Sequence, residues 1–89
     1  MMEIIVKKLT EKEIEEKGIE SWPIWEKEVS RFDWYYDSTE YCQILEGKVF
    51  VETSNGTTEI NAGDFVIFPK GLKCVWDIKR KIRKYYDFE

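Results

Sequence analysis

The chain is 89 residues long and carries 14 basic and 18 acidic residues, no histidine and a net charge of −4 at pH 7. This length corresponds to one small domain, and the acidic balance excludes the basic surface of a nucleic-acid-binding protein. No apolar run reaches the ~18 residues of a membrane span and no charged-then-apolar leader is found, so we expect a cytoplasmic protein with no membrane partner. Enrichment in Glu and Lys with a single glutamine favours a thermophilic source.

A short strand and a short helix are predicted at the beginning of the chain. Residues 4–6 form an apolar run that ends in two lysines, as is typical of an edge strand. Thr10 and Glu13 have the spacing of a capping box, and Gly18 is a natural helix end. One helix over about residues 11–17 follows from these signals.

The rest of the chain is predicted to be all-β. Residues 22–25 (Trp-Pro-Ile-Trp) are expected to be extended, since the residue before a proline avoids helical geometry, and we interpret them as a cover over one opening of a barrel. Residues 1–27 then precede the barrel and residues 28–89 form it, within one domain spanning residues 1–89. The candidate strands are residues 28–36, 40–46, 48–54, 57–61, 64–68, 72–79 and 82–88.

Two glycines mark important reversals between these strands. Asn55-Gly56 is typical of a two-residue type I′ hairpin turn. Gly47 is interpreted as a second reversal, which separates residues 40–46 from residues 48–54.

Period-two alternation predicts which side chains face the inside of the barrel. Aromatic residues make up 16% of the chain, which is ample volume to fill a small barrel or to line it. The predicted inward set is Trp34, Tyr36, Glu40, Cys42, Cys74, Trp76 and Lys84.

Two spaced patterns occur in the predicted barrel. Glu40 stands seven positions before Gly47. In the second pattern, five, one and two residues separate Gly63, Pro69, Gly71 and Cys74. These spacings resemble the two cupin motifs, G-x5-HxH-x3,4-E-x6-G and G-x5-P-x-G-x2-H-x3-N.

The order of further residues narrows this resemblance. They are similar to the small single-domain, RmlC-like cupins grouped with ureidoglycine aminohydrolase and the ethanolamine-utilisation cupins, and above all to short stand-alone bacterial members with no assigned reaction. The resemblance implies a small conical cupin barrel (a jelly roll, or double-stranded β-helix) of about eight strands with one short N-terminal helix. The residues that carry it are Phe32, Trp34, Tyr36, Glu40, Leu45-Glu46-Gly47, Ala62-Gly63-Asp64, Phe68-Pro69, Gly71, Trp76 and Arg83-Lys84.

Cupins usually bind a metal through two histidines and a glutamate of the first motif and a histidine of the second. The resemblance places Trp34 and Tyr36 on the paired histidine positions and Cys74 on the last one. Because the chain has no histidine, we predict no metal cofactor. Cys74 is either an inert core thiol or a zinc ligand assisted by Glu40 and Tyr36, and a disulfide with Cys42 is a third interpretation.

Glu40 is the candidate around which a site would be built. An ionised carboxylate among apolar side chains costs several kcal/mol unless it is paired or hydrogen-bonded. Glu40 is therefore solvated by a cavity, protonated, or paired with Lys84 or Arg83. In a functional interpretation it anchors a ligand or acts as a general acid/base, with Cys74 assisting. In a structural interpretation it lies at the barrel mouth, bonded to Tyr36 and backbone amides.

The aromatic and basic candidates also have two interpretations each. Trp34, Tyr36 and Trp76 either form a pocket that stacks a flat or sugar-like ligand or simply fill the barrel. Arg83 and Lys84 are adjacent in a predicted strand, so their side chains point to opposite faces and one of them points inward. The inward residue is a counter-ion for Glu40 or for an anionic ligand, unless the pair only protects an edge strand.

Three hypotheses for function follow. The first is a metal-independent cupin that binds a small polar or carboxylate-bearing molecule. The second is an enzyme related to ureidoglycine aminohydrolase that acts on a small nitrogenous or sugar-derived substrate. The third is a structural or interaction module with a filled barrel, and the chain is expected to be a monomer or a homodimer. Lack of histidine excludes Ser-His-Asp and Cys-His hydrolases and oxygenases with two histidine ligands.

Overall fold

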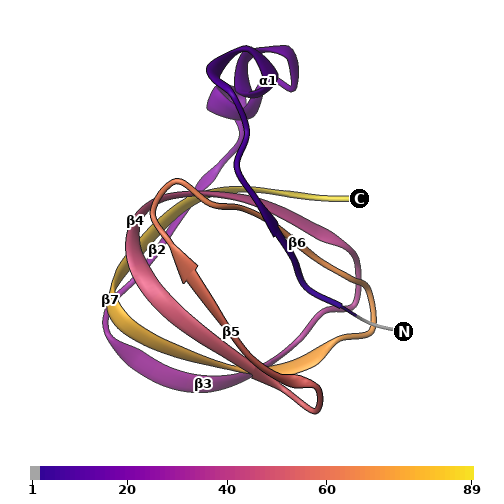
Figure 1. The fold of residues 1–89 in the computed structure, drawn as a ribbon, viewed down its shortest axis with the longest axis vertical. Coiled ribbons are helices and arrows are strands. Elements are labelled where there is room, and N and C mark those ends of the chain that lie inside the picture. Colours follow the sequence, from indigo (N-terminus) through magenta and orange to yellow (C-terminus); the bar gives the residue numbers. More distant parts are fainter. Residues whose placement is uncertain (1–2) are drawn as a thin grey trace.

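The computed structural model describes residues 3–89 of the chain. This part contains seven antiparallel strands and one short α-helix (Figure 1). The strands curve round into a barrel, and the helix lies outside it. The all-β prediction with one small helix is therefore confirmed. The elements are β1 Ile5–Lys7, α1 Glu11–Glu16, the 3-10 turn η1 Ile19–Ser21, β2 Ile24–Lys27, β3 Ser30–Tyr35, β4 Glu40–Thr53, β5 Gly56–Asn61, β6 Phe65–Phe68 and β7 Lys73–Phe88.

Two long strands, β4 and β7, connect the two halves of the barrel. The first part of β4 pairs with β6 and with the end of β7, where Ile44 lies opposite Lys84. The second part of β4 pairs with β5 and with the beginning of β7, where Val51 lies opposite Trp76. The short strands β2 and β3 pair with the end and the beginning of β7, and β1 pairs with β6. Every short strand is thus attached directly or through β6 to this central pair.

The prediction of a reversal at Gly47 is wrong, because β4 continues through this residue. Pairing with β7 is irregular between Ile44 and Val49, so the strand bends there instead of turning back. Across the bend, the buried residues of β4 change from even-numbered positions such as Ile44 to odd-numbered ones such as Val49 and Val51. The predicted strands 40–46 and 48–54 are thus two parts of the single strand β4. The predicted strands 72–79 and 82–88 are likewise two parts of the single strand β7.

Gly47 fits this bend because it has no side chain. Its φ of 104° lies in the left-handed region. A Cβ at this position would overlap with the carbonyl oxygen of Lys81 and lie 2.9 Å from Cα of Ile82. The close approach of β4 to β7 at the bend therefore depends on a glycine.

The N-terminal region is partly as predicted. The capping box of Thr10 and Glu13 is present in both directions, and Gly18 ends the helical region with a φ of 65°. None of the residues of α1 is buried, and no helix within residues 3–89 is long and apolar enough to cross a membrane. The segment after Pro23 is extended, but as a strand of the barrel wall: β2 pairs along the end of β7. Both β1 and β2 belong to the sheet, so strands of the wall are found before the predicted residue 28.

The hairpin between β4 and β5 lies where the sequence indicates, with a different turn. Thr53 pairs with Gly56, so the loop residues are Ser54 and Asn55. Asn55 does not have the positive φ that a type I′ turn requires of both loop residues, so that turn type is wrong. Only Gly56 has a positive φ here.

The core of the barrel is apolar, and the buried polar or charged residues within residues 3–89 are Glu40, Gln43, Asp64 and Lys84. Aliphatic side chains of β4, β5 and β7 pack together with Tyr36, Phe68 and Trp76 into one core. Two of the buried polar or charged residues, Glu40 and Lys84, carry opposite charges, and only 3% and 5% of their surfaces are exposed. This pair is the starting point of the candidate site.

Candidate functional site

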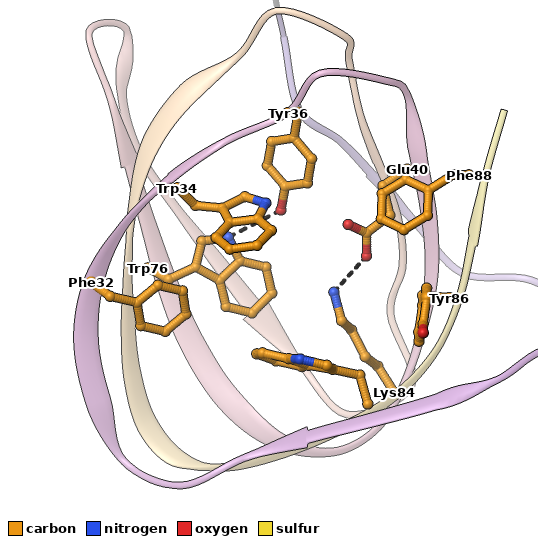
Figure 2. Close-up of a pocket in the computed structure, with 9 residues that line it drawn as sticks. Phe32, Trp34, Tyr36, Glu40, Trp76, Lys84, Tyr86 and Phe88 are labelled. Carbon is orange, nitrogen blue, oxygen red and sulfur yellow. Dashed lines mark hydrogen bonds and ion pairs between the residues drawn. The ribbon is translucent and has the colours of Figure 1, made fainter.

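A cavity of about 210 Å³ lies inside the barrel beside these two charges (Figure 2). The cavity is partly open to solvent, and two of the residues that line it, Trp34 and Phe88, are about half exposed. This volume is below the ~300–1,000 Å³ of pockets for drug-sized ligands, so it suits a small molecule. The lining residues are Trp25, Phe32, Trp34, Tyr36, Glu40, Trp76, Lys84, Tyr86 and Phe88.

Strand pairing brings these side chains together from distant parts of the chain. Glu40 is the first residue of β4, and Lys84 lies on the end of β7. Trp25 is the cross-strand partner of Lys84, and Phe32 is the partner of Trp76. The cavity is therefore enclosed by β2, β3, β4 and β7, whose registers fix its polar and aromatic groups relative to one another.

Glu40 and Lys84 form a buried ion pair. Nζ of Lys84 lies 2.6 Å from Oε2 of Glu40 and 3.3 Å from Sγ of Cys42, whose thiol is 2.7 Å from the same carboxylate oxygen. Of the alternatives for Glu40 left open by the sequence, the structure selects pairing with Lys84. The alternative hydrogen bond from Tyr36 to Glu40 is not formed; the tyrosine oxygen instead accepts a hydrogen bond from Nε1 of Trp76.

The ammonium group of Lys84 lies among aromatic rings. Nζ is 4.9 Å from the ring centre of Trp25, 4.8 Å from that of Trp76 and 6.0 Å from that of Phe68. Burial alone would lower the pKa of Lys84, but Cys42 and Glu40 outweigh it and raise the pKa. Lys84 is consequently a cation at neutral pH, stabilised by one carboxylate and by ring faces.

Tyr36 supplies a neutral hydroxyl next to the pair. Its ring stacks on Phe68 with 4.7 Å between ring centres, and its oxygen accepts a hydrogen bond of 3.1 Å from Nε1 of Trp76. Burial first, and then the nearby Glu40, raise the pKa of Tyr36 well above its ordinary value. The phenol therefore keeps its proton and can donate it in a hydrogen bond.

Cys74 lies apart from the cavity. It is buried, lies opposite Trp34 on the neighbouring strand, and lines with this tryptophan a separate open surface groove. Burial and Glu40 raise the pKa of Cys74 to about 11, and burial also raises that of Cys42. Both cysteines are free, buried thiols that stay protonated at neutral pH, whereas a nucleophilic cysteine needs a lowered pKa.

Arg83 is exposed and does not line the cavity. The prediction that one of Arg83 and Lys84 points inward is therefore resolved in favour of Lys84. Of the predicted site residues, the structure brings Trp34, Tyr36, Glu40, Trp76 and Lys84 together around one cavity.

Four lining residues were not among the predicted site residues. Tyr86 and Phe88 lie on the same face of β7 as Lys84, and Phe32 lies on the same face of β3 as Trp34. The period-two pattern could therefore have identified these three residues. Trp25 could not be found this way, because its segment was interpreted as a cover and not as a strand.

The residues at the metal-ligand positions of cupins do not fit a metal here. The indole of Trp34 has an N–H donor and no free lone pair, and the oxygen of Tyr36 already accepts from Trp76. Oε2 of Glu40 is held by the ammonium of Lys84. Within residues 3–89, no three Cys, Asp or Glu side chains are grouped so that they could hold a metal ion.

Known proteins resemble this chain in both sequence and fold. Residues 14–86 match the model of the EutQ-like cupin domain. A DUF861 family protein from Thermotoga maritima is 51% identical over 98% of this chain and 100% of its own, with a TM-score of 0.95. A DUF861 family protein of unknown function from Pseudomonas syringae is 25% identical over 74% of this chain and 29% of its own, with a TM-score of 0.67.

A more distant likeness extends to the EutQ protein of Clostridium difficile, which is 20% identical over 98% of this chain and 68% of its own. Its TM-score of 0.69 reflects a shared fold. Among curated protein sequences, no significant match is found.

Proposed function

Because the chain belongs to the EutQ-like cupin family, we propose that it binds a small polar molecule in the barrel without the help of a metal ion. The observation that carries this proposal is the buried Glu40–Lys84 ion pair, which lines a cavity open to solvent and otherwise walled by aromatic rings. Small-molecule sites have this composition, with mostly apolar walls and a few fixed polar groups.

The energetics of the pair favour a functional role over a structural one. A buried ion pair costs so much desolvation that apolar side chains of similar size often stabilise a fold equally well or better. Glu40 and Lys84 could thus be replaced by apolar residues if filling the barrel were their only role. Charged groups retained at a cavity are instead typical of sites that orient a ligand.

The same chemistry supports binding more than catalysis. The thiols of Cys42 and Cys74 and the hydroxyl of Tyr36 all have raised pKa values, and Lys84 is held as an ammonium ion. None of these groups is an activated nucleophile in this state. The cavity also weighs against an interaction module with a filled barrel.

The proposal predicts ligand-induced stabilisation that does not depend on metal. A library of metabolites no larger than a substituted single ring is screened by thermal unfolding in the presence of EDTA. A ligand present at ten times its Kd stabilises the native state by about 1.4 kcal/mol, and the midpoint of unfolding rises by about 8 °C for a domain of this size.

Two variants locate the binding site. Glu40→Gln combined with Lys84→Met replaces the charges by groups of similar shape and should abolish the rise. Arg83→Gln, one residue away and outside the cavity, should retain it. Ligands that require added metal, or that stabilise both variants equally, would contradict the proposal.

A further inference from the structure

The two oxygens of the Glu40 carboxylate have different surroundings. Oε2 accepts from both Lys84 and Cys42, at 2.6 and 2.7 Å. Oε1 receives no hydrogen bond from any residue of the described chain, and it is not sealed in the protein as the orphaned Oε1 of Gln43 is. Figure 2 shows the carboxylate directed into the cavity, so Oε1 is an acceptor available to a ligand.

Tyr36 offers the complementary group. Its oxygen is engaged as an acceptor by Nε1 of Trp76, but its own hydrogen has no acceptor among residues 3–89. The hydroxyl points toward the same space as the Glu40 carboxylate (Figure 2). The cavity therefore presents one free acceptor and one free donor, both on buried side chains.

The charge of the cavity disfavours ionic ligands. Glu40 and Lys84 are the only charged residues among those that line it, and they neutralise each other. An anion would face the Glu40 carboxylate while the ammonium group is already paired. A cation at Oε1 would share that carboxylate with Lys84 and be repelled by it.

The walls select for shape. The rings of Phe32, Trp34, Tyr86 and Phe88 border the same space and present flat apolar faces. A planar group lies against such faces with favourable stacking. With about 210 Å³ available, the ligand is no larger than one ring with small substituents.

We infer that the ligand is a neutral, flat molecule with a hydrogen-bond donor beside an acceptor, as in a carboxamide or a lactam. Its N–H group donates to Oε1 of Glu40, and its carbonyl oxygen accepts from the hydroxyl of Tyr36. This inference rests on the proposed function and narrows the polar or carboxylate-bearing molecule expected from the sequence to an uncharged one.

The test compares four probes of similar size: benzamide, benzoate, benzylammonium and toluene. Each is titrated into ¹⁵N-labelled protein at pH 7 while the indole N–H signals of the tryptophans are followed by NMR. Trp25, Trp34 and Trp76 line the cavity, and Trp22 does not, so its signal is an internal control. Benzamide is expected to bind at least tenfold more tightly than each of the other three probes.

Variants assign the two hydrogen bonds. Tyr36→Phe should lower the affinity for benzamide at least fivefold and leave the affinity for toluene unchanged. Glu40→Gln removes the carboxylate charge beside Lys84, so benzoate should then bind at least tenfold more tightly than it does to the wild type. Arg83→Gln should leave all four affinities unchanged. The indole signals also report whether each variant is folded.

The outcomes separate this inference from the proposed function. If benzoate or benzylammonium binds the wild type as tightly as benzamide does, the ligand class is wrong while small-molecule binding stands. Equal affinity of toluene and benzamide would likewise contradict the two hydrogen bonds. If none of the probes shifts the three cavity signals, both the proposed function and the inference fail.

Discussion

Lys84 contacts both the charged partner and the aromatic residues of the site. The side chain pairs with Glu40 on one side and lies between the rings of Trp25 and Trp76 on another. The strength of this arrangement depends on both charges, because each one alone would be buried without a partner.

Removing one charge should therefore be costlier than removing both. Lys84→Met leaves Glu40 buried and unpaired, and we expect the free energy of unfolding to fall by about 3–5 kcal/mol, with a similar loss for Glu40→Gln. The double variant should lose much less than the sum of the two. Urea unfolding of the four proteins measures this coupling, and Arg83→Met should change stability by no more than about 0.5 kcal/mol. Additive losses would show that the pair does not act as a unit.

The sequence could identify these residues but not their pairing. Alternation placed Glu40 and one of Arg83 and Lys84 on the inner face, which the structure confirms for Lys84. Which group neutralises Glu40 depends on the register between β4 and β7, a long-range property that local patterns do not contain. The role of Cys42 as a third member of the cluster was missed for the same reason.

At the scale of elements, the bend in β4 decides which residues reach the site. Because the inward positions change parity near Gly47, both Glu40 at one end and Val51 at the other face the interior. Strand ends and turns can be predicted from glycine and polar residues. Whether a glycine bends a strand or reverses the chain depends on the partner strand. This is why the prediction of a reversal at Gly47 was wrong.

A pair of glycine variants tests the bend. Both Gly47 and Gly56 have positive φ values, so alanine at either position is strained by about 1–3 kcal/mol. Only at residue 47 would the new methyl group also collide with the backbone of β7, whereas nothing lies within 4 Å at residue 56. We expect Gly47→Ala to lose at least about 2 kcal/mol more than Gly56→Ala in denaturant unfolding. Equal losses would mean that the β4–β7 contact at the bend can relax freely.

For the molecule as a whole, the family and the general fold could be predicted because they depend on spacing and alternation. The order of Glu40, Gly47, Gly63, Pro69 and Gly71 was sufficient for the cupin assignment. The presence of a cavity could not be predicted, because it depends on how the aromatic side chains pack once the barrel is closed. The thermophilic source stays a prediction, although the charge composition favours it.

Stability of the whole molecule should decline in alkali. The thiols of Cys42 and Cys74 and the ammonium of Lys84 all have raised pKa values in the native state. An unfolded thiol ionises near pH 9 while Cys74 keeps its proton up to about pH 11, so its stabilising contribution is present below pH 9 and lost as the pH rises toward 11. Chemical unfolding between pH 7 and pH 11 should show this decline, and Cys74→Val should reduce it. A flat profile up to pH 11 would contradict the assignment.

The pairing of β4 with β7, two strands distant in the sequence, also has a consequence for how the chain folds. Residues far apart in sequence, such as Glu40 and Phe88, must meet before the central strands can form. Such non-local topologies fold slowly, since loop closure precedes the contacts that compensate for it. During synthesis, the central pair cannot be completed until residues 73–88 have emerged from the ribosome. Until then, the edge of β4 that pairs with β7 lacks its partner, and an unpaired strand edge is a site of aggregation.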